Sequence, residues 1–352
     1  MRYFTHPIVF VLLFCACLLP SLQAQDPRFS QYYASPWNLN PAMTGVFNGR
    51  WRVTGNYRDQ WSSILKNVPF RTYSVAGDAR FNLGRYDYVA FGGGVLHDEA
   101  GTSRFSQNRF HVGGAYLKKL AGGRYSADHY LSVGAQLGMG QNAVDWGRLW
   151  FSRQYNPGTV SVDPNLSSGE PNTKGQTKVF ADFNAGLLWY TMFGDNGFFY
   201  AGGAIHHLNR PVVSLIGDDR ETMYQRFSVQ AGGQFPLNEK FSVLPGVVAM
   251  KQGPSFETDL GINLRYSNND QHELALRFGA WGRLGNRLDK GLISDAVTIV
   301  GMLELNRCLL GLSYDITVSS LSSANSSRGA FELSFTYFHP GERRSRVTCP
   351  MF

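Results

Sequence analysis

Apolar and polar residues alternate in repeated runs along most of this 352-residue chain. In residues 255–266 the two alternating sets are Phe256, Thr258, Leu260, Ile262, Leu264 and Tyr266 against Glu257, Asp259, Gly261, Asn263 and Arg265. Residues 51–58 and 331–337 follow the same rule. Successive side chains of a β-strand point to opposite faces, so each run predicts a strand with one apolar and one polar face.

Fourteen strands are expected from these runs. They cover residues 50–61, 71–81, 86–97, 105–119, 128–141, 179–192, 197–207, 223–236, 240–250, 255–266, 272–284, 293–305, 307–319 and 329–339. A tilted strand needs roughly 9–11 residues to cross a hydrocarbon layer, and these runs are that long, whereas most strands of soluble sandwiches have about 5–6 residues. Strand length therefore favours a transmembrane antiparallel β-barrel over a secreted β-sandwich.

The connections between the expected strands alternate in length. Those after even-numbered strands are mostly short, such as residues 82–85 and 193–196, whereas those after odd-numbered strands include the long stretches 142–178 and 208–222. Outer-membrane barrels combine short periplasmic turns with longer outer loops in this way. An even number of strands then leaves both termini in the periplasm.

Residues 1–24 are expected to be a signal peptide that is removed from the mature protein. A basic start precedes an apolar stretch, residues 8–19, that is too short to span a bilayer, and Ala24 offers a small residue for cleavage. The mature chain then begins at Gln25. Beyond Ala24 no apolar run approaches the roughly 20 residues of a membrane helix.

The mature chain is expected to have three parts: an irregular segment (25–48), an outer-membrane barrel (49–339) and a periplasmic tail (340–352). The first part does not alternate and carries three prolines and several large aromatic residues, too many for a solvated leader. We expect it to pack at the periplasmic mouth of the barrel, where it plugs the lumen or presents a surface to a partner. The candidate residues are Phe29, Tyr32, Tyr33, Trp37, Asn40 and Pro41.

Composition excludes two broad classes of function. Charged residues make up 17% of the chain and it has 39 glycines, which is unlike an ordinary cytosolic enzyme. The formal net charge is +7, but the positive residues are scattered, and the tight basic cluster is Arg343, Arg344 and Arg346. No nucleic-acid partner is therefore expected.

Chemical motifs are sparse. His206 and His207 are neighbours on an expected strand, so they should point to opposite faces and cannot bind one metal together. The sequence His97-Asp98-Glu99 lies where an outer loop is expected to begin and lacks an identifiable nucleophile. We therefore predict no catalytic residue, no metal site and no cofactor.

Polar residues on the expected inward faces carry both signs of charge. They are Arg52, Arg58, Asp78, Arg80, Arg109, Asp182, Asn184, Glu257, Asp259, Arg265, Arg277, Arg283 and Asp315. Mixed charge favours ion-pair networks that fill the lumen over an ion-selective channel. If the turn after residue 266 centres near Asn269, Asp259 should pair with Arg277 across the lumen face.

Two cysteines remain once the signal peptide is removed, Cys308 and Cys349. Cys308 begins an expected strand after a short turn, and Cys349 lies in the tail beyond the neighbouring strand. Both are expected on the periplasmic side, where export makes a disulfide possible.

Several motifs resemble a known family. They are Gln-Asp-Pro-Arg-Phe-Ser-Gln-Tyr-Tyr at 25–33, Asn-Pro-Ala-Met-Thr-Gly at 40–45, Tyr-Arg-Asp-Gln-Trp at 57–61, Ala-Ile-His-His-Leu-Asn-Arg-Pro at 204–211, Gly-Leu-Ser-Tyr-Asp at 311–315 and Gly-Ala-Phe-Glu-Leu-Ser at 329–334. Their order is similar to that of the PorP/SprF family of type IX secretion proteins. The resemblance implies a Bacteroidetes outer-membrane barrel that helps to export or anchor secreted proteins such as gliding adhesins. Its implied partners are outer-membrane lipid, periplasmic and outer-membrane subunits of the machine, and exported cargo. The long 142–178 loop and the tail depart from the family pattern.

Three functions follow as hypotheses. The first is a non-enzymatic component of the secretion machinery. The second is a porin or a lipid or solute transporter, which an open, conducting lumen would favour. The third is an outer-membrane hydrolase, which a nucleophile beside His97 would favour.

Overall fold

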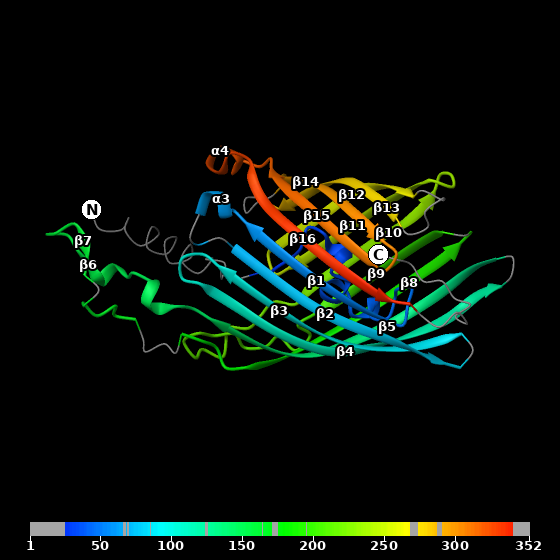
Figure 1. The fold of residues 1–352 in the computed structure, drawn as a ribbon. Helices are drawn as coiled ribbons and strands as arrows, with labels where there is room; N and C mark the ends of the chain where they lie inside the picture. The colour runs from blue at the N-terminus through cyan, green and yellow to red at the C-terminus, as the bar shows by residue number, and fades with distance from the viewer. Residues whose placement is uncertain are drawn as a thin grey trace, which may run out of the picture.

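Fourteen antiparallel strands close into a barrel in the computed structural model (Figure 1). The structure describes residues 25–340 apart from 66–67, 69, 85, 124–125, 164, 171–174, 195, 268–273 and 287–290. Each barrel strand pairs with its neighbours along the chain, and β1 closes the barrel by pairing with β16. The strands are β1 (Trp51–Gln60), β2 (Phe70–Leu83), β3 (Asp87–Ala100), β4 (Phe105–Gly123), β5 (Ser126–Ala143), β8 (Phe180–Phe193), β9 (Gly197–His206), β10 (Arg226–Pro236), β11 (Phe241–Gln252), β12 (Ser255–Ser267), β13 (Leu274–Asn286), β14 (Leu292–Leu305), β15 (Cys308–Thr317) and β16 (Arg328–His339). The barrel and the number of its strands predicted from alternation are confirmed.

The two ends of the barrel differ in their connections. At one end, the turn end, short connections join the strands. The other, the loop end, carries α3 (Ser62–Leu65), α4 (Ser322–Asn325) and an arm formed by the connection from β5 to β8. In Figure 1 the arm projects beyond the barrel at the left. Its elements are η3 (Trp146–Arg148), η4 (Ser152–Gln154) and the hairpin of β6 (Tyr155–Asn156) and β7 (Ser161–Val162).

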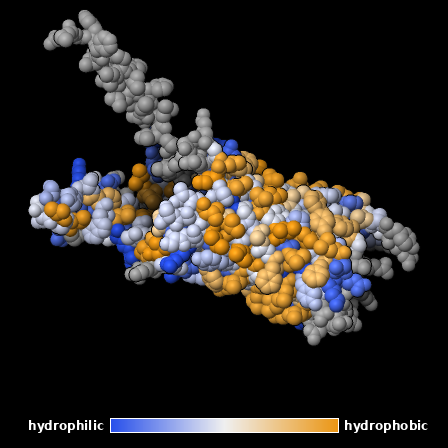
Figure 2. Space-filling view, turned by 90° about the horizontal axis from the view of Figure 1, so that it is seen from above, coloured by the Kyte–Doolittle hydropathy of each residue, from blue (hydrophilic) through white to orange (hydrophobic). Residues whose placement is uncertain are grey.

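The outer wall of the barrel is apolar and its inner wall is polar. Figure 2 shows many hydrophobic residues over the barrel on the face that it draws. The exposed large apolar side chains include Val75, Phe91, Leu137, Met139, Phe278 and Ile299. Charged side chains are buried inside. In water this arrangement would expose most of the apolar surface, whereas in a bilayer it places that surface against lipid and leaves no open sheet edge.

No helix among the described residues is long and apolar enough to cross a membrane.

Residues 25–48, called here the lumen segment, run through the inside of the barrel. Gln25 lies near Gln107, close to the loop end of β4, and Arg50 donates to the carbonyl of His339 at the turn end, where β1 begins. Between these points the segment forms η1 (Tyr32–Ala34), α2 (Pro36–Leu39) and η2 (Pro41–Met43). The segment was expected at the periplasmic mouth; in the structure it runs along the lumen between the two ends, and which end faces the periplasm stays a prediction.

The described chain therefore begins and ends at opposite ends of the barrel. Gln25 lies near the loop end, whereas Pro340 follows β16 at the turn end. This differs from the expectation that both termini lie on the periplasmic side. An even number of strands places the start of β1 and the end of β16 on the same side, but it says nothing about a preceding segment that turns back through the lumen.

Inward-facing glycines make room for the lumen segment. A Cβ added at Gly94 would lie 2.8 Å from the indole of Trp37, and one added at Gly246 would lie 2.6 Å from the hydroxyl oxygen of Tyr32. Gly134 faces the backbone of residues 41–42 at a similarly close distance. Glycine is needed at these positions because backbone or a large ring occupies the space that a side chain would fill.

Candidate functional site in the barrel lumen

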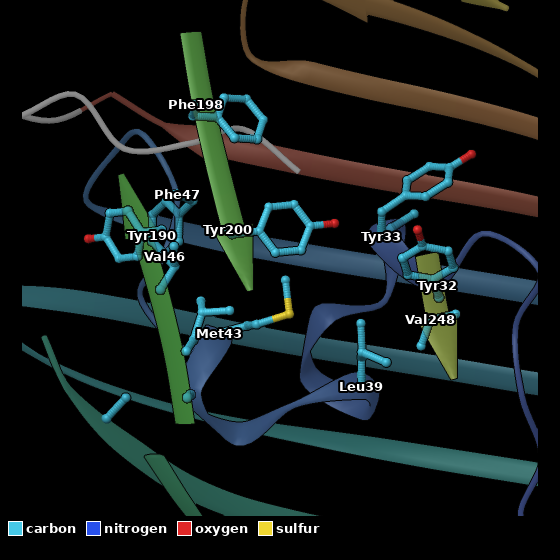
Figure 3. Packing of buried hydrophobic residues seen from close by; sticks show 14 of the residues in the cluster. Tyr32, Tyr33, Leu39, Met43, Val46, Phe47, Tyr190, Phe198, Tyr200 and Val248 are labelled. Carbon is cyan, nitrogen blue, oxygen red and sulfur yellow. The ribbon is translucent and has the colours of Figure 1, made fainter. Parts of the chain in front are cut away.

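The turn-end half of the lumen segment is held by apolar packing. Ala42, Met43, Val46 and Phe47 are all between 0% and 1% exposed. Figure 3 shows Met43, Val46 and Phe47 beside tyrosines that point inward from the barrel strands. Full burial of side chains the size of Met43, Val46 and Phe47 contributes about 1.5–3 kcal/mol each. This half is therefore a fixed anchor.

Polar contacts orient the anchor. The guanidinium of Arg52 donates twice to the carboxylate of Asp78, with both distances 2.9 Å, and also to the carbonyl of Met43. The same carboxylate accepts from the backbone of Gly45. Arg52 also lies over the ring of Phe47, 4.8 Å from its centroid. The predicted lumenal ion pairs thus reach the backbone of the segment.

The six candidate residues of the lumen segment are all buried. Tyr32 packs edge-on against Trp281 of β13, with ring centroids 5.3 Å apart. Asn40 donates its amide to the carbonyls of Leu187 and Gly203 at 3.2 Å each. The other four are Phe29, Tyr33, Trp37 and Pro41.

The loop-end half of the segment is held by charged groups. The carboxylate of Glu332, on β16, accepts the backbone N–H of Ser30 at 2.7 Å and that of Gln31 at 2.9 Å. Asp315, on β15, accepts from the Ser30 hydroxyl at 2.9 Å and from Arg58 and Arg283 at 2.8 and 3.0 Å. Glu332 was missed as a site residue by sequence reasoning, although it lies on the polar face of an alternating strand.

A network of acidic and basic side chains binds Asp26, at the start of the lumen segment. The Nε2 atom of His207 lies 2.6 Å from the carboxylate of Asp26, and its Nδ1 atom lies 2.8 Å from Asp182. Asp182 also contacts His111 at 2.9 Å, and Arg226 lies 3.1 Å from Asp26. We call the contact of Asp26 with His207 and Arg226 the latch.

The expectation for the two adjacent histidines is wrong. His206 and His207 are both buried, and neither faces the outside of the barrel. β9 ends at His206, and His207 has a φ of +57°, so its side chain turns back into the lumen instead of alternating outward. His206 contacts the carbonyl of Leu39. Within the described residues no group of three or more His, Cys, Asp or Glu is arranged to hold a metal ion.

The predicted pair of Asp259 and Arg277 is also wrong. Asp259 accepts from Arg283 at 3.0 Å, and Arg277 instead pairs with Glu304 of β14. In the observed register Arg283 lies directly opposite Asp259, and Gly261 lies opposite Trp281 rather than Arg277. The error came from the assumed centre of the turn, which displaced the register by four positions.

Two further expectations concern single motifs. His97, Asp98 and Glu99 belong to β3 rather than to a loop, and His97 contacts Asn108 while Asp98 accepts from Thr72. Cys308 begins β15 at the turn end. Cys349 lies outside the described residues, so the predicted disulfide stays a prediction.

Two cavities beside the lumen segment are small. One is lined by Tyr33, Tyr200 and Arg277, among others, and the other by Trp37, His111 and Asp182, with volumes of about 30 and 40 Å³. Such spaces hold a few water molecules. The segment therefore fills the lumen along these walls.

The latch predicts a pH-dependent stability. Burial alone would lower the pKa of His207, but the carboxylates of Asp26 and Asp182 outweigh it and raise that pKa to about 9. Burial would raise the pKa of Asp26, yet His207 and Arg226 hold it well below the ordinary value. The stabilisation from His207 is thus fully present below about pH 6.5 and is lost as the pH rises through about 9.

We expect this loss to be on the order of 3 kcal/mol of unfolding free energy, from a pKa change of 6.5 to about 9. Urea unfolding between pH 6 and pH 10 measures it, and the difference between the native chain and His207→Gln isolates the latch from other titrating groups. A difference that stays constant across this range would contradict the assignment.

The chain was compared with protein-family models, curated proteins and solved structures. The family model described as type IX secretion system membrane protein PorP/SprF matches residues 21–337. No curated protein matches the chain significantly. Among solved structures, a KdgM porin in complex with disordered oligogalacturonate is 9% identical with a TM-score of 0.36, covering 82% of this chain and 99% of that one.

Two other solved structures are similar to the chain. A mutant of the TodX monoaromatic hydrocarbon channel is 12% identical with a TM-score of 0.42, covering 85% of this chain and 92% of that one. CdiB from Acinetobacter baumannii is 8% identical with a TM-score of 0.45, covering 82% and 60%. At these identities and TM-scores, no function of those proteins is assigned to this chain.

Proposed function

Because the chain belongs to the PorP/SprF family of type IX secretion membrane proteins, we propose that it assists the export or surface anchoring of secreted proteins, such as adhesins of a gliding machinery. It acts without catalysis. Its partners are outer-membrane lipid, other subunits of the secretion machine and the exported cargo. The turn end faces the periplasm and the loop end faces outward, after removal of a signal peptide at residues 1–24.

The filled lumen is the observation that supports this role over diffusion of solutes. The lumen segment crosses the barrel from the loop end to the turn end, and both of its halves are bound to the wall. A diffusion porin needs a continuous aqueous path. A closed barrel is suited instead to binding protein partners at its two ends.

A deletion strain tests the proposal. We expect surface adhesins to remain unexported or to be degraded, while uptake of small hydrophilic solutes is unchanged. The purified protein should also conduct poorly in a planar bilayer. Normal export in the deletion strain, combined with large and steady conductance of the protein, would replace the secretion role with that of a porin.

A further inference from the structure

Residues 26–31 lie in the loop-end half of the lumen as an extended segment bound by the barrel wall. They form no strand or helix. The backbone N–H groups of Asp26, Ser30 and Gln31 donate to side chains of the wall rather than to a β-ladder. Two successive backbone N–H groups, those of Ser30 and Gln31, donate to the two oxygens of one carboxylate, Glu332. These two contacts recognise the main chain of the occupant; its side chains are recognised by other groups of the wall.

Side chains of the segment are bound as well. The Gln31 amide donates to the Ser313 hydroxyl at 3.1 Å and accepts from the Ser334 hydroxyl at 2.7 Å. Gly311 leaves the space that this amide occupies, because a Cβ there would clash with it. A glutamine side chain is thus fitted at this position.

Charge fixes the direction of the segment. Asp26 meets His207 and Arg226, whereas Arg28 meets Glu257 of β12. The wall therefore has a cationic subsite, formed by His207 and Arg226, and an anionic subsite, formed by Glu257. The bound residues that contact these two subsites are two positions apart in the segment. An extended peptide with an acidic residue followed two positions later by a basic one complements this pattern.

We propose that the loop-end half of the lumen is a binding site for an extended peptide, which residues 26–31 of the chain itself occupy. The ligand is an unfolded segment of another polypeptide that carries an acidic residue, a basic residue two positions later and a Ser-Gln pair after that. The site is defined by its wall contacts and does not rest on the secretion role. Exchange requires the polar contacts of residues 26–31 to break and Phe29 to leave its buried position, while the apolar anchor at residues 42–47 stays in place.

The first test supplies the ligand in trans. A variant lacking residues 25–31 is reconstituted, and binding of a fluorescent heptapeptide with the sequence of those residues is measured by anisotropy. We expect saturable binding that Glu332→Gln weakens at least tenfold, because it removes half of a charged double acceptor. The control Glu170→Gln, in the exposed arm, should leave binding unchanged. Absence of binding, or equal binding to the Glu332→Gln form, would overturn the proposal.

The second test uses the full chain and does not depend on folding of the deletion. Hydrogen exchange at the amides of Ser30 and Gln31 is followed by mass spectrometry, with an isotopically labelled heptapeptide in excess. Displacement of the segment should speed their exchange at least tenfold relative to a scrambled peptide. Equal exchange with both peptides would show that the site does not accept a peptide in trans.

Discussion

Replacing Gly134 by valine is expected to displace the lumen segment and to turn a closed barrel into a conducting one. Gly134 faces the lumen from β5, and a Cβ there would lie 2.6 Å from the backbone nitrogen of Ala42 and still closer to Pro41. Backbone cannot move aside as a flexible side chain does. Overpacking of a filled interior typically costs about 1–3 kcal/mol and can cost more. Because the clash here is with the backbone of the anchor itself, we expect a cost above that range, which displacement of residues 41–42 relieves.

Planar-bilayer conductance measures this opening. The matched control is Gly55→Val on β1, where no atom lies within 4 Å of an added Cβ. The control should conduct as poorly as the native protein. If the Gly134 variant folds as a barrel and conducts no better than the control, the segment is not what closes the lumen.

Alternation was sufficient to predict the barrel because it is a property of each strand by itself. The run at 255–266 corresponds to β12 (Ser255–Ser267), and all fourteen expected strands coincide with observed ones to within a few residues. Lipid outside and a polar lumen inside impose the same period on every strand. The polarity of inward residues such as Asp315 followed from the same rule.

The partners of the inward polar residues did not follow from alternation. Partners depend on register, and an error of four positions at one turn was enough to separate Asp259 from its true partner, Arg283. The inward orientation of the His207 side chain depends on a positive φ after the end of a strand, and the residue type does not reveal that φ. Both features are set by the way in which turns close, not by hydrophobic period.

The path of the lumen segment was the least predictable feature. Its aromatic residues indicated that the segment packs against the barrel. The inward glycines opposite them show which part of the wall the segment contacts. Gly94 and Trp37 are separated by many residues, and their match is steric. The inward glycines of β3, β5 and β11 are the sequence signal that, together with correct register, would have traced the segment.

Asp315→Asn is expected to be strongly destabilising, because two buried cations lose their shared counter-charge. Arg58 and Arg283 each donate to Asp315, and all three side chains are no more than 5% exposed. Breaking a buried ion pair from one side costs about 3–5 kcal/mol, and the nearby carboxylates keep the loss near the lower value. Urea unfolding in detergent micelles measures the loss.

The matched control for this variant is Asp218→Asn, in the connection from β9 to β10. Asp218 pairs with Arg220 at 2.8 Å, but the Arg220 side chain is 91% exposed, so water replaces the lost partner. A solvent-exposed ion pair contributes little to stability, because water solvates both charges when the pair is broken. The two substitutions remove the same charge from the same residue type, and they differ in whether the remaining cation is solvated. Equal unfolding midpoints for the two variants would mean that the lumenal network does not hold the wall and the segment together.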